Sequence, residues 1–115
     1  MKQADKDLLI KDLCGRLPYG VILNCCNIVG EKLIAIDENG LINHDYDIDE
    51  VKPYLFPLPS MTEEQIKEFN SITQKCSTYI GKSILLTDFC NKHHIDYRGL
   101  IPKGLAKDAT GLNIY

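Results

Sequence analysis

The chain has 115 residues and a formal net charge of −3, with 44% hydrophobic and 25% charged residues. This length is typical of one domain with its own core, so we expect a single domain over residues 1–115. The composition is too apolar for a disordered chain, and its apolar runs are too short for a membrane span. Residues 1–7 lead into a charged helix rather than an apolar signal core, so we expect a cytoplasmic protein without a membrane partner.

The cysteines and the net charge exclude two further classes of protein. Five cysteines make an odd count without a Cys-x-x-Cys pair, whereas a secreted disulfide scaffold normally carries an even number in a shorter chain. We therefore expect reduced, mostly buried thiols, and we predict no cofactor. The net negative charge argues against a general nucleic-acid coat, which needs an excess of Lys and Arg to displace counterions.

The N-terminal part of the chain predicts one helix and two short strands. The spacing of its leucines predicts a helix over 5–17, with Gly15 as the C-cap. Residues 20–27 alternate in the manner of a strand, and a turn is expected at 29–30. The next strand is expected over 32–37.

The segment after this second strand allows two hairpin loops. A two-residue turn would pair Ile36 with Asn43 and Ile34 with Asp45. A three-residue loop pairs Ile36 with Ile42 and Ile34 with His44. We predict the three-residue loop because it keeps apolar residues opposite each other. It also places Asp37 at the start of a type I turn and Gly40 at the left-handed position of the bulge.

The middle of the chain predicts extended backbone. Residues 44–49 alternate acidic and apolar side chains, which predicts an extended segment with one wet face that includes Asp45 and Asp47. Residues 51–59 contain three prolines, which disfavour both a regular helix and a central strand. We therefore expect an extended crossover that lies on the core.

Two helices are expected in the C-terminal half. The first begins at Thr62, where Gln65 completes a capping box, and it ends at Gly81. Its apolar stripe comprises Ile66, Phe69, Thr73, Cys76 and Ile80. The second covers about 84–94 and begins at Ser83 or Thr87. The predicted fold is α+β: an N-terminal helix, a small antiparallel β-meander, an extended Pro-rich segment and two C-terminal helices packed on one sheet face.

One cluster has the residue types of a metal or cysteine site. Cys90, His93 and His94 place ligands three and four residues apart on a helix, and Cys25 and Cys26 would add thiolates, so zinc binding is an alternative. Adjacent cysteines on a strand point to opposite faces, however, which disfavours a shared ion. The chain has no Gly-rich phosphate loop, no GxSxG and no HExxH. We therefore expect a protein that is not an enzyme and holds no metal.

A second alternative is nucleic-acid binding by the basic segment 92–107. The segment combines cations with one stacking ring, in Lys92, His93, His94, Tyr97, Arg98 and Lys103. Arg98 and Tyr97 would contact phosphate and base. The alternative interpretation is that these cations interact with the dipole and free carbonyls at the C-terminus of the preceding helix, while Tyr97 and Arg98 pack locally.

The leading functional prediction is contact with another protein or self-association. The Pro-rich run carries more apolar surface than one loop needs, and its exposure would mark Tyr54, Phe56 and Leu58 as partner-binding residues. The acidic residues Asp45 and Asp47 would extend the same surface. The alternative is that the apolar residues of the run close the core. We expect a small accessory protein that acts through protein–protein contacts.

Three stretches of the chain also resemble a known family. They are residues 8–21 (LLIKDLCGRLPYGV), 48–55 (IDEVKPYL) with 60–64 (SMTEE), and 91–101 (NKHHIDYRGLI) with 103–106 (KGLA). The set is similar to an uncharacterised family of small proteins from Bacteroides-type gut bacteria, their prophages and mobile elements. The resemblance spans nearly the whole chain and implies a bacterial or phage origin. It implies no activity and assigns no functional residue.

Overall fold

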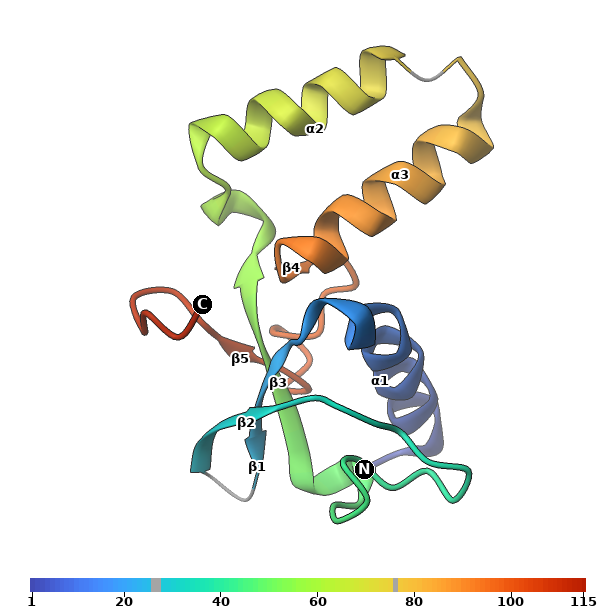
Figure 1. Cartoon of the computed structure of the whole chain (residues 1–115), viewed down its shortest axis with the longest axis vertical. Helices are drawn as coiled ribbons and strands as arrows, with labels where there is room; N and C mark the ends of the chain where they lie inside the picture. Colours follow the sequence, from blue (N-terminus) through green and yellow to red (C-terminus); the bar gives the residue numbers. More distant parts are fainter. Residues whose placement is uncertain (26–27, 76) are drawn as a thin grey trace.

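The structure is a computed structural model that describes residues 1–25, 28–75 and 77–115. Over these residues the chain forms three α-helices and a mixed five-stranded sheet, an α+β fold (Figure 1). It measures 42 × 31 × 23 Å with a radius of gyration of 14.5 Å, somewhat above the roughly 13 Å of a compact chain of this length. The elongation reflects a helical hairpin that rises from one end of the sheet. None of the helices over these residues is long and apolar enough to cross a bilayer.

Helix α1 spans Gln3–Arg16 and buries one stripe of side chains, formed by Leu9, Asp12, Leu13 and Arg16. The predicted C-cap at Gly15 is wrong, because this glycine lies inside the helix. A Cβ atom at Gly15 would lie 2.9 Å from Nδ2 of Asn91, so the missing side chain lets α1 approach the last helix closely. The helix ends one residue later, before a 3-10 turn over Leu17–Tyr19 that contains Pro18.

The sheet is mixed rather than the expected antiparallel meander. Its strands are β1 (Ile22–Cys25), β2 (Ile28–Lys32), β3 (Val51–Pro57), β4 (Ile95–Asp96) and β5 (Lys107–Asp108). Strand β1 pairs antiparallel with both β2 and β3, whereas β4 and β5 pair parallel with β3. Parallel pairing joins segments that are distant along the chain, so no local turn signal announces it.

Strand β2 does not lie where the sequence pattern placed it. The predicted turn at 29–30 is wrong, because both residues belong to β2, in which Gly30 adopts a φ of 118°. Strand β2 ends at Lys32, so the prediction of a strand over 32–37 is wrong for the residues after Lys32. The predicted strand over 20–27 is shortened to Ile22–Cys25, and residues 26–27 lie outside the described part of the chain.

The three-residue hairpin loop is confirmed. Gly40 N–H donates to the carbonyl of Asp37 at 2.9 Å, Gly40 has a φ of 77°, and Ile36 pairs with Ile42. The pairing does not continue to Ile34 and His44, because the chain turns again at residues 43–45.

The prediction of extended backbone over 44–49 is wrong. The prediction that the acidic side chains face solvent while the apolar ones face the protein is right. His44 adopts a positive φ of 64°, and residues 48–50 form a 3-10 helix that Asp47 caps together with Glu50. Ile48 is nevertheless buried, while Asp45 and Asp47 are exposed. Two successive turns therefore keep the acids in solvent, and no edge strand is available here for a partner.

The Pro-rich segment forms strand β3, which pairs with β1, β4 and β5. The prediction that this segment would not form a central strand is therefore wrong. Backbone N–H groups alternate in direction along a strand, and Phe56 N–H donates to the carbonyl of His94 at 2.8 Å. The N–H groups missing at Pro53 and Pro57 would point the other way. Strand β5 pairs there with residues 54–55, so neither proline is needed as a donor.

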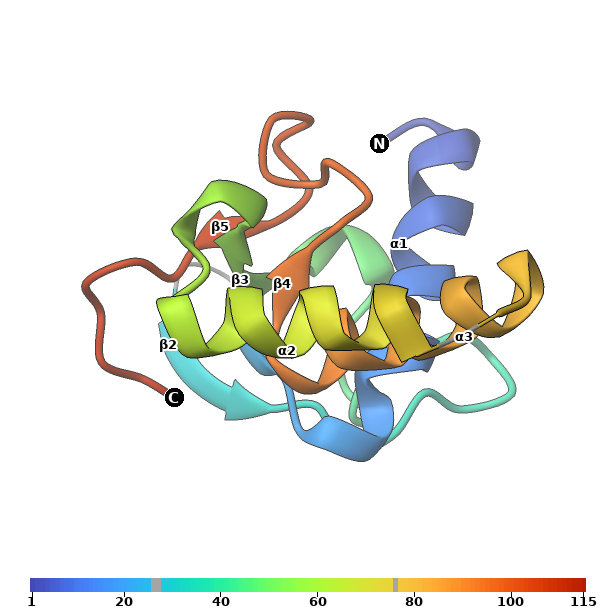
Figure 2. The ribbon, with the colours of Figure 1, turned by 90° about the horizontal axis from the view of Figure 1, so that it is seen from above.

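Helices α2 (Glu63–Lys75) and α3 (Tyr79–Lys92) form the hairpin, which lies over the end of β3 and β4 (Figures 1 and 2). The capping box is confirmed, because Thr62 N–H donates to Gln65 Oε1 at 3.0 Å and Gln65 N–H donates to Thr62 Oγ1 at 3.2 Å. The predicted boundary at Gly81 is wrong. Helix α3 begins after Thr78, whose hydroxyl accepts the Gly81 N–H at 3.1 Å, and Cys76 lies outside the described residues.

Two apolar clusters hold the described residues together. The larger joins α1 to the sheet and its loops, and includes Leu13, Leu23 and Leu55. The smaller, built on Phe89, Cys90 and Ile95, is packed by Met61, Phe69, Ile72 and Tyr97. The hairpin is therefore attached to the body of the protein through a second, smaller core.

Candidate functional site

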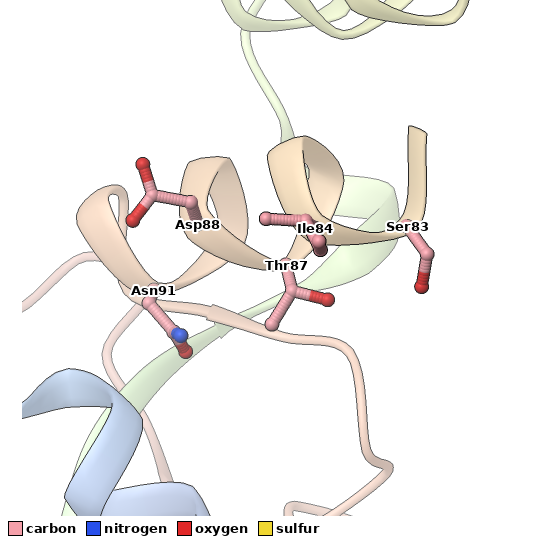
Figure 3. Close-up of a pocket in the computed structure, with 5 residues that line it drawn as sticks. All are labelled: Ser83, Ile84, Thr87, Asp88 and Asn91. Carbon is pink, nitrogen blue, oxygen red and sulfur yellow. The ribbon is translucent and has the colours of Figure 1, made fainter. Parts of the chain in front are cut away.

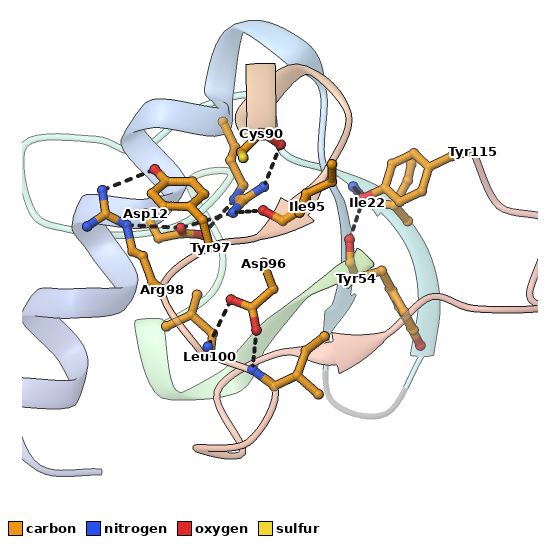
Figure 4. Close-up of polar contacts among 12 residues, drawn as sticks. Asp12, Ile22, Tyr54, Cys90, Ile95, Asp96, Tyr97, Arg98, Leu100 and Tyr115 are labelled. Carbon is orange, nitrogen blue, oxygen red and sulfur yellow. Dashed lines mark hydrogen bonds and ion pairs between the residues drawn. The ribbon is translucent and has the colours of Figure 1, made fainter. Parts of the chain in front are cut away.

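A buried ion pair lies where α1 meets the end of α3. Arg16 Nε donates to Asp12 Oδ2 at 2.7 Å and Arg16 Nη2 donates to Asp12 Oδ1 at 3.2 Å, with both side chains fully buried. Arg16 also donates to the carbonyls of Ile95 at 2.7 Å and Cys90 at 3.5 Å. The guanidinium thus joins α1 to the C-terminus of α3 and to β4. Figure 4 labels its partners Asp12, Cys90 and Ile95.

Arg98 and Tyr97 belong to the same network. Arg98 Nε donates to Asp12 Oδ1 at 3.2 Å, and Arg98 Nη2 donates to the Tyr97 hydroxyl at 3.2 Å. The guanidinium carbons of Arg16 and Arg98 lie 5.3 Å and 4.9 Å from the centre of the Tyr97 ring. The two residues expected to contact nucleic acid are partly buried and already contact other residues of the chain, whereas Lys92 and Lys103 are exposed.

The two neighbouring histidines point to different partners. The His93 ring lies 4.6 Å from that of Phe89, and its Nε2 lies 3.5 Å from a carboxylate oxygen of Glu68. His94 adopts a φ of 59° and stacks on Tyr115 at 3.8 Å between ring centres. Cys90 is buried, which raises the pKa of its thiol. Over the described residues no group of three His, Cys, Asp or Glu side chains is placed to hold a metal ion, and Cys26 lies outside them.

Tyr115 fills a gap in the sheet. Its hydroxyl accepts the Ile22 N–H at 2.8 Å and donates to the carbonyl of Tyr54 at 2.8 Å, so it bridges β1 and β3 where their ladder would otherwise continue. The ring also packs against Phe56 with the ring centres 5.8 Å apart. Burial raises the pKa of Tyr115 to about 12.

The stacked His94 predicts a pH dependence of stability. Burial, followed by the positive charges of Arg16 and His93, lowers the pKa of His94 from 6.5 to about 4. The unfolded chain therefore binds this proton at higher pH than the folded one, so the contribution is complete above about pH 6.5 and is lost as the pH falls toward 4. We expect a loss of about 1–2 kcal/mol, below the full linkage value because the ring is partly solvated.

Urea denaturation between pH 7 and 4.5 checks this effect by comparison with His94→Phe, which keeps the ring but cannot bind the proton. The difference between the two proteins isolates His94 from the carboxylates that titrate over the same range. Parallel stability profiles for wild type and His94→Phe would contradict the prediction.

Of the five residues predicted to bind a partner, Tyr54 is buried, Phe56 is partly buried and the other three are exposed. Tyr54 is 4% exposed, and its hydroxyl accepts a hydrogen bond from Asn24 Nδ2 at 2.9 Å. Phe56 is partly buried against Tyr115, and Leu58 is 44% exposed. Asp45 and Asp47 lie in solvent on the loop before β3. The Pro-rich run therefore supplies core residues at its start and one exposed apolar side chain at its end.

The N-terminal half of α3 exposes large apolar side chains, of which the sequence pattern had placed Ile80 in the apolar stripe of the preceding helix. Tyr79 is 87%, Ile80 73% and Ile84 63% exposed, and Leu85 is also exposed. Successive helical residues are rotated by about 100°, so Ile84, Leu85 and Leu86 point in three different directions. A helix that is apolar on all sides is typically buried. The run of apolar residues at 84–86 is the sequence signal that could have indicated this exposed apolar surface.

Three adjoining hollows follow the length of α3. The one in Figure 3 has a volume of about 330 Å³ and is lined by Ser83, Ile84, Thr87, Asp88 and Asn91. Thr87 and Asn91 point to one side of the helix and Asp88 to the other, where it accepts a hydrogen bond from the Tyr19 hydroxyl. The hydrogen bond to Asp88 raises the pKa of Tyr19, and the negative charge of Asp88 adds to this increase. Helix α3 therefore contributes to the lining of all three hollows.

Comparison with known proteins gives no match to a family model, to a curated protein or to a solved structure.

Proposed function

We propose that this protein is a small non-enzymatic accessory protein that works through protein–protein contacts made by the N-terminal half of α3. The proposal is carried by the exposure of Tyr79, Ile80 and Ile84 on one stretch of helix. Isolated apolar side chains on a surface are ordinary, but a contiguous group of large ones is typical of an interaction site. A prophage or mobile-element origin belongs to the same proposal and rests on the sequence resemblance alone.

A matched pair of variants tests this surface. Ile80→Ser combined with Ile84→Ser removes two exposed apolar side chains from α3, whereas Ile34→Ser removes one of similar exposure from a distant loop. All these side chains are exposed, so the variants should fold like the wild type. We expect self-association or binding of a co-purifying protein to weaken about ten-fold or more in the α3 variant and to persist in Ile34→Ser.

Sedimentation velocity over a concentration series measures self-association, and quantitative affinity purification of the full chain from its host measures binding to another protein. A strictly monomeric protein without a bound partner would contradict the proposal. Equal association of both variants would contradict the assignment to α3.

Nucleic-acid binding by residues 92–107 stays an alternative prediction. Arg98→Glu is a poor test, because it would place a second carboxylate beside the buried Asp12 and destabilise the fold. Lys92→Glu with Lys103→Glu changes only exposed side chains. Filter binding at low salt measures the affinity, and the alternative requires an affinity that falls with salt and is lost in this variant.

A further inference from the structure

Two of the hollows along α3 adjoin and differ in chemistry. The apolar hollow, of about 170 Å³, is lined by Leu58, Phe69, Leu86, Thr87, Cys90 and Tyr97. The cationic hollow, of about 300 Å³, is lined by Tyr79, Lys82, Ser83, Leu86 and Thr87. The two hollows share Leu86 and Thr87 in their linings, so they adjoin along one turn of α3. We refer to both together as the α3 groove.

The apolar hollow has the size and lining for one small ring. Its volume is close to that of apolar cavities that bind benzene, which are about 150 Å³. Phe69 and Tyr97 offer aromatic surface, and the sulfur of Cys90 is suited to contact with a ring edge. Thr87 supplies a hydroxyl. The lining therefore favours an apolar group and provides no charged partner inside.

The cationic hollow supplies the charge that the apolar hollow lacks. Lys82 precedes Leu86 by four residues, which places the two side chains on the same face of α3. Lys82 is only partly exposed, and none of the ion pairs among the described residues involves it. The hydroxyls of Ser83 and Thr87 line the same hollow and are able to donate to an anion.

We propose that the α3 groove binds a small free carboxylic acid with an apolar ring, which lies in the apolar hollow while its carboxylate faces Lys82. Charge complementarity selects an acid over a neutral or basic molecule of the same shape. Ile80, Ile84 and Leu85 line neither hollow. Tyr79 belongs to both the α3 groove and the protein-binding surface, so the two sites adjoin. The isoleucines that are substituted to test protein contacts lie outside the lining of the groove.

The experiment compares 3-phenylpropionate with its neutral amide, 3-phenylpropionamide, by amide NMR titration of the full chain at low salt. We expect shifts at residues 82–90 and a dissociation constant on the order of 1 mM for the acid. The amide should bind about two- to five-fold more weakly, and added salt should reduce this difference. Lys82→Met should abolish the preference, whereas Lys67→Met, which changes an exposed lysine of α2 outside both hollows, should preserve it.

Leu86→Trp fills the apolar hollow and should weaken binding of both molecules. If that variant does not fold, Lys82→Met decides alone, because its side chain is partly exposed and outside the core. No shift at residues 82–90 near the solubility limit of the acid overturns the proposal. Equal affinity for acid and amide, or a preference retained by Lys82→Met, overturns it as well. The Ile80→Ser, Ile84→Ser protein should bind the acid as the wild type does, whatever the outcome for protein contacts.

Discussion

Replacing Asp12 with alanine is expected to lower the free energy of unfolding by about 3–5 kcal/mol. Arg16 is fully buried, and the change removes the carboxylate that meets its guanidinium at 2.7 Å and 3.2 Å. The charge of Arg16 would then be left in the interior with two backbone carbonyls and the Tyr97 ring, but without a counter-charge. A loss of this size is a large part of the 5–15 kcal/mol that stabilises a typical domain. Urea denaturation followed by circular dichroism measures it.

Asp7→Ala is the matched control. Asp7 lies on the same helix, is exposed, and accepts a hydrogen bond from Gln3 at 2.8 Å. Its removal should change stability by no more than about 0.5 kcal/mol. Equal stability of Asp12→Ala and Asp7→Ala would show that the buried pair does not hold α1 to the end of α3.

Truncation of the central strand should have a comparable effect. Leu55 is fully buried in the larger cluster, so Leu55→Ala should cost about 2–5 kcal/mol through lost burial and the cavity left behind. Leu58→Ala removes the same atoms three residues later, where the side chain is 44% exposed, and should cost about 0.5 kcal/mol or less.

This pair distinguishes the two interpretations of the Pro-rich segment. A strand buried in the sheet predicts a large difference between the two leucines, whereas the exposed partner-binding run expected from the sequence predicts a small effect at both. Thermal unfolding of the two variants under identical conditions measures the difference. Similar midpoints for both would contradict the position of β3.

Features set by neighbouring residues were predictable from the sequence. The capping box of Thr62 and Gln65 and the loop between Asp37 and Gly40 depend on hydrogen bonds within three or four residues, and both are confirmed. Local patterns failed where distant segments decide. Gly15 and Gly81 both resemble helix ends, but one permits contact with α3 and the other receives a cap from Thr78.

The candidate site was predicted less well for the same physical reason. Arg98 and Tyr97 look like surface groups in the sequence, and only their distance to Asp12 and Arg16, more than 80 residues away along the chain, shows that they are engaged. The exposed face of α3 was missed because Ile80 extended the apolar stripe of the preceding helix. The preceding helix was predicted to end at Gly81 instead of Lys75, and this shift was enough to assign the exposed Ile80 to an apolar stripe.

The separation of the apolar interior into two clusters of unequal size has a consequence for dynamics. Cooperative units with few buried contacts open at a lower free energy than the rest of a protein. Amide hydrogens of α2 and the first turns of α3 should therefore exchange with solvent deuterium well before those of Leu23 in β1. A molecule that covers the first half of α3 would slow this exchange selectively, so deuterium uptake of the helical hairpin reports occupancy without a label on the ligand.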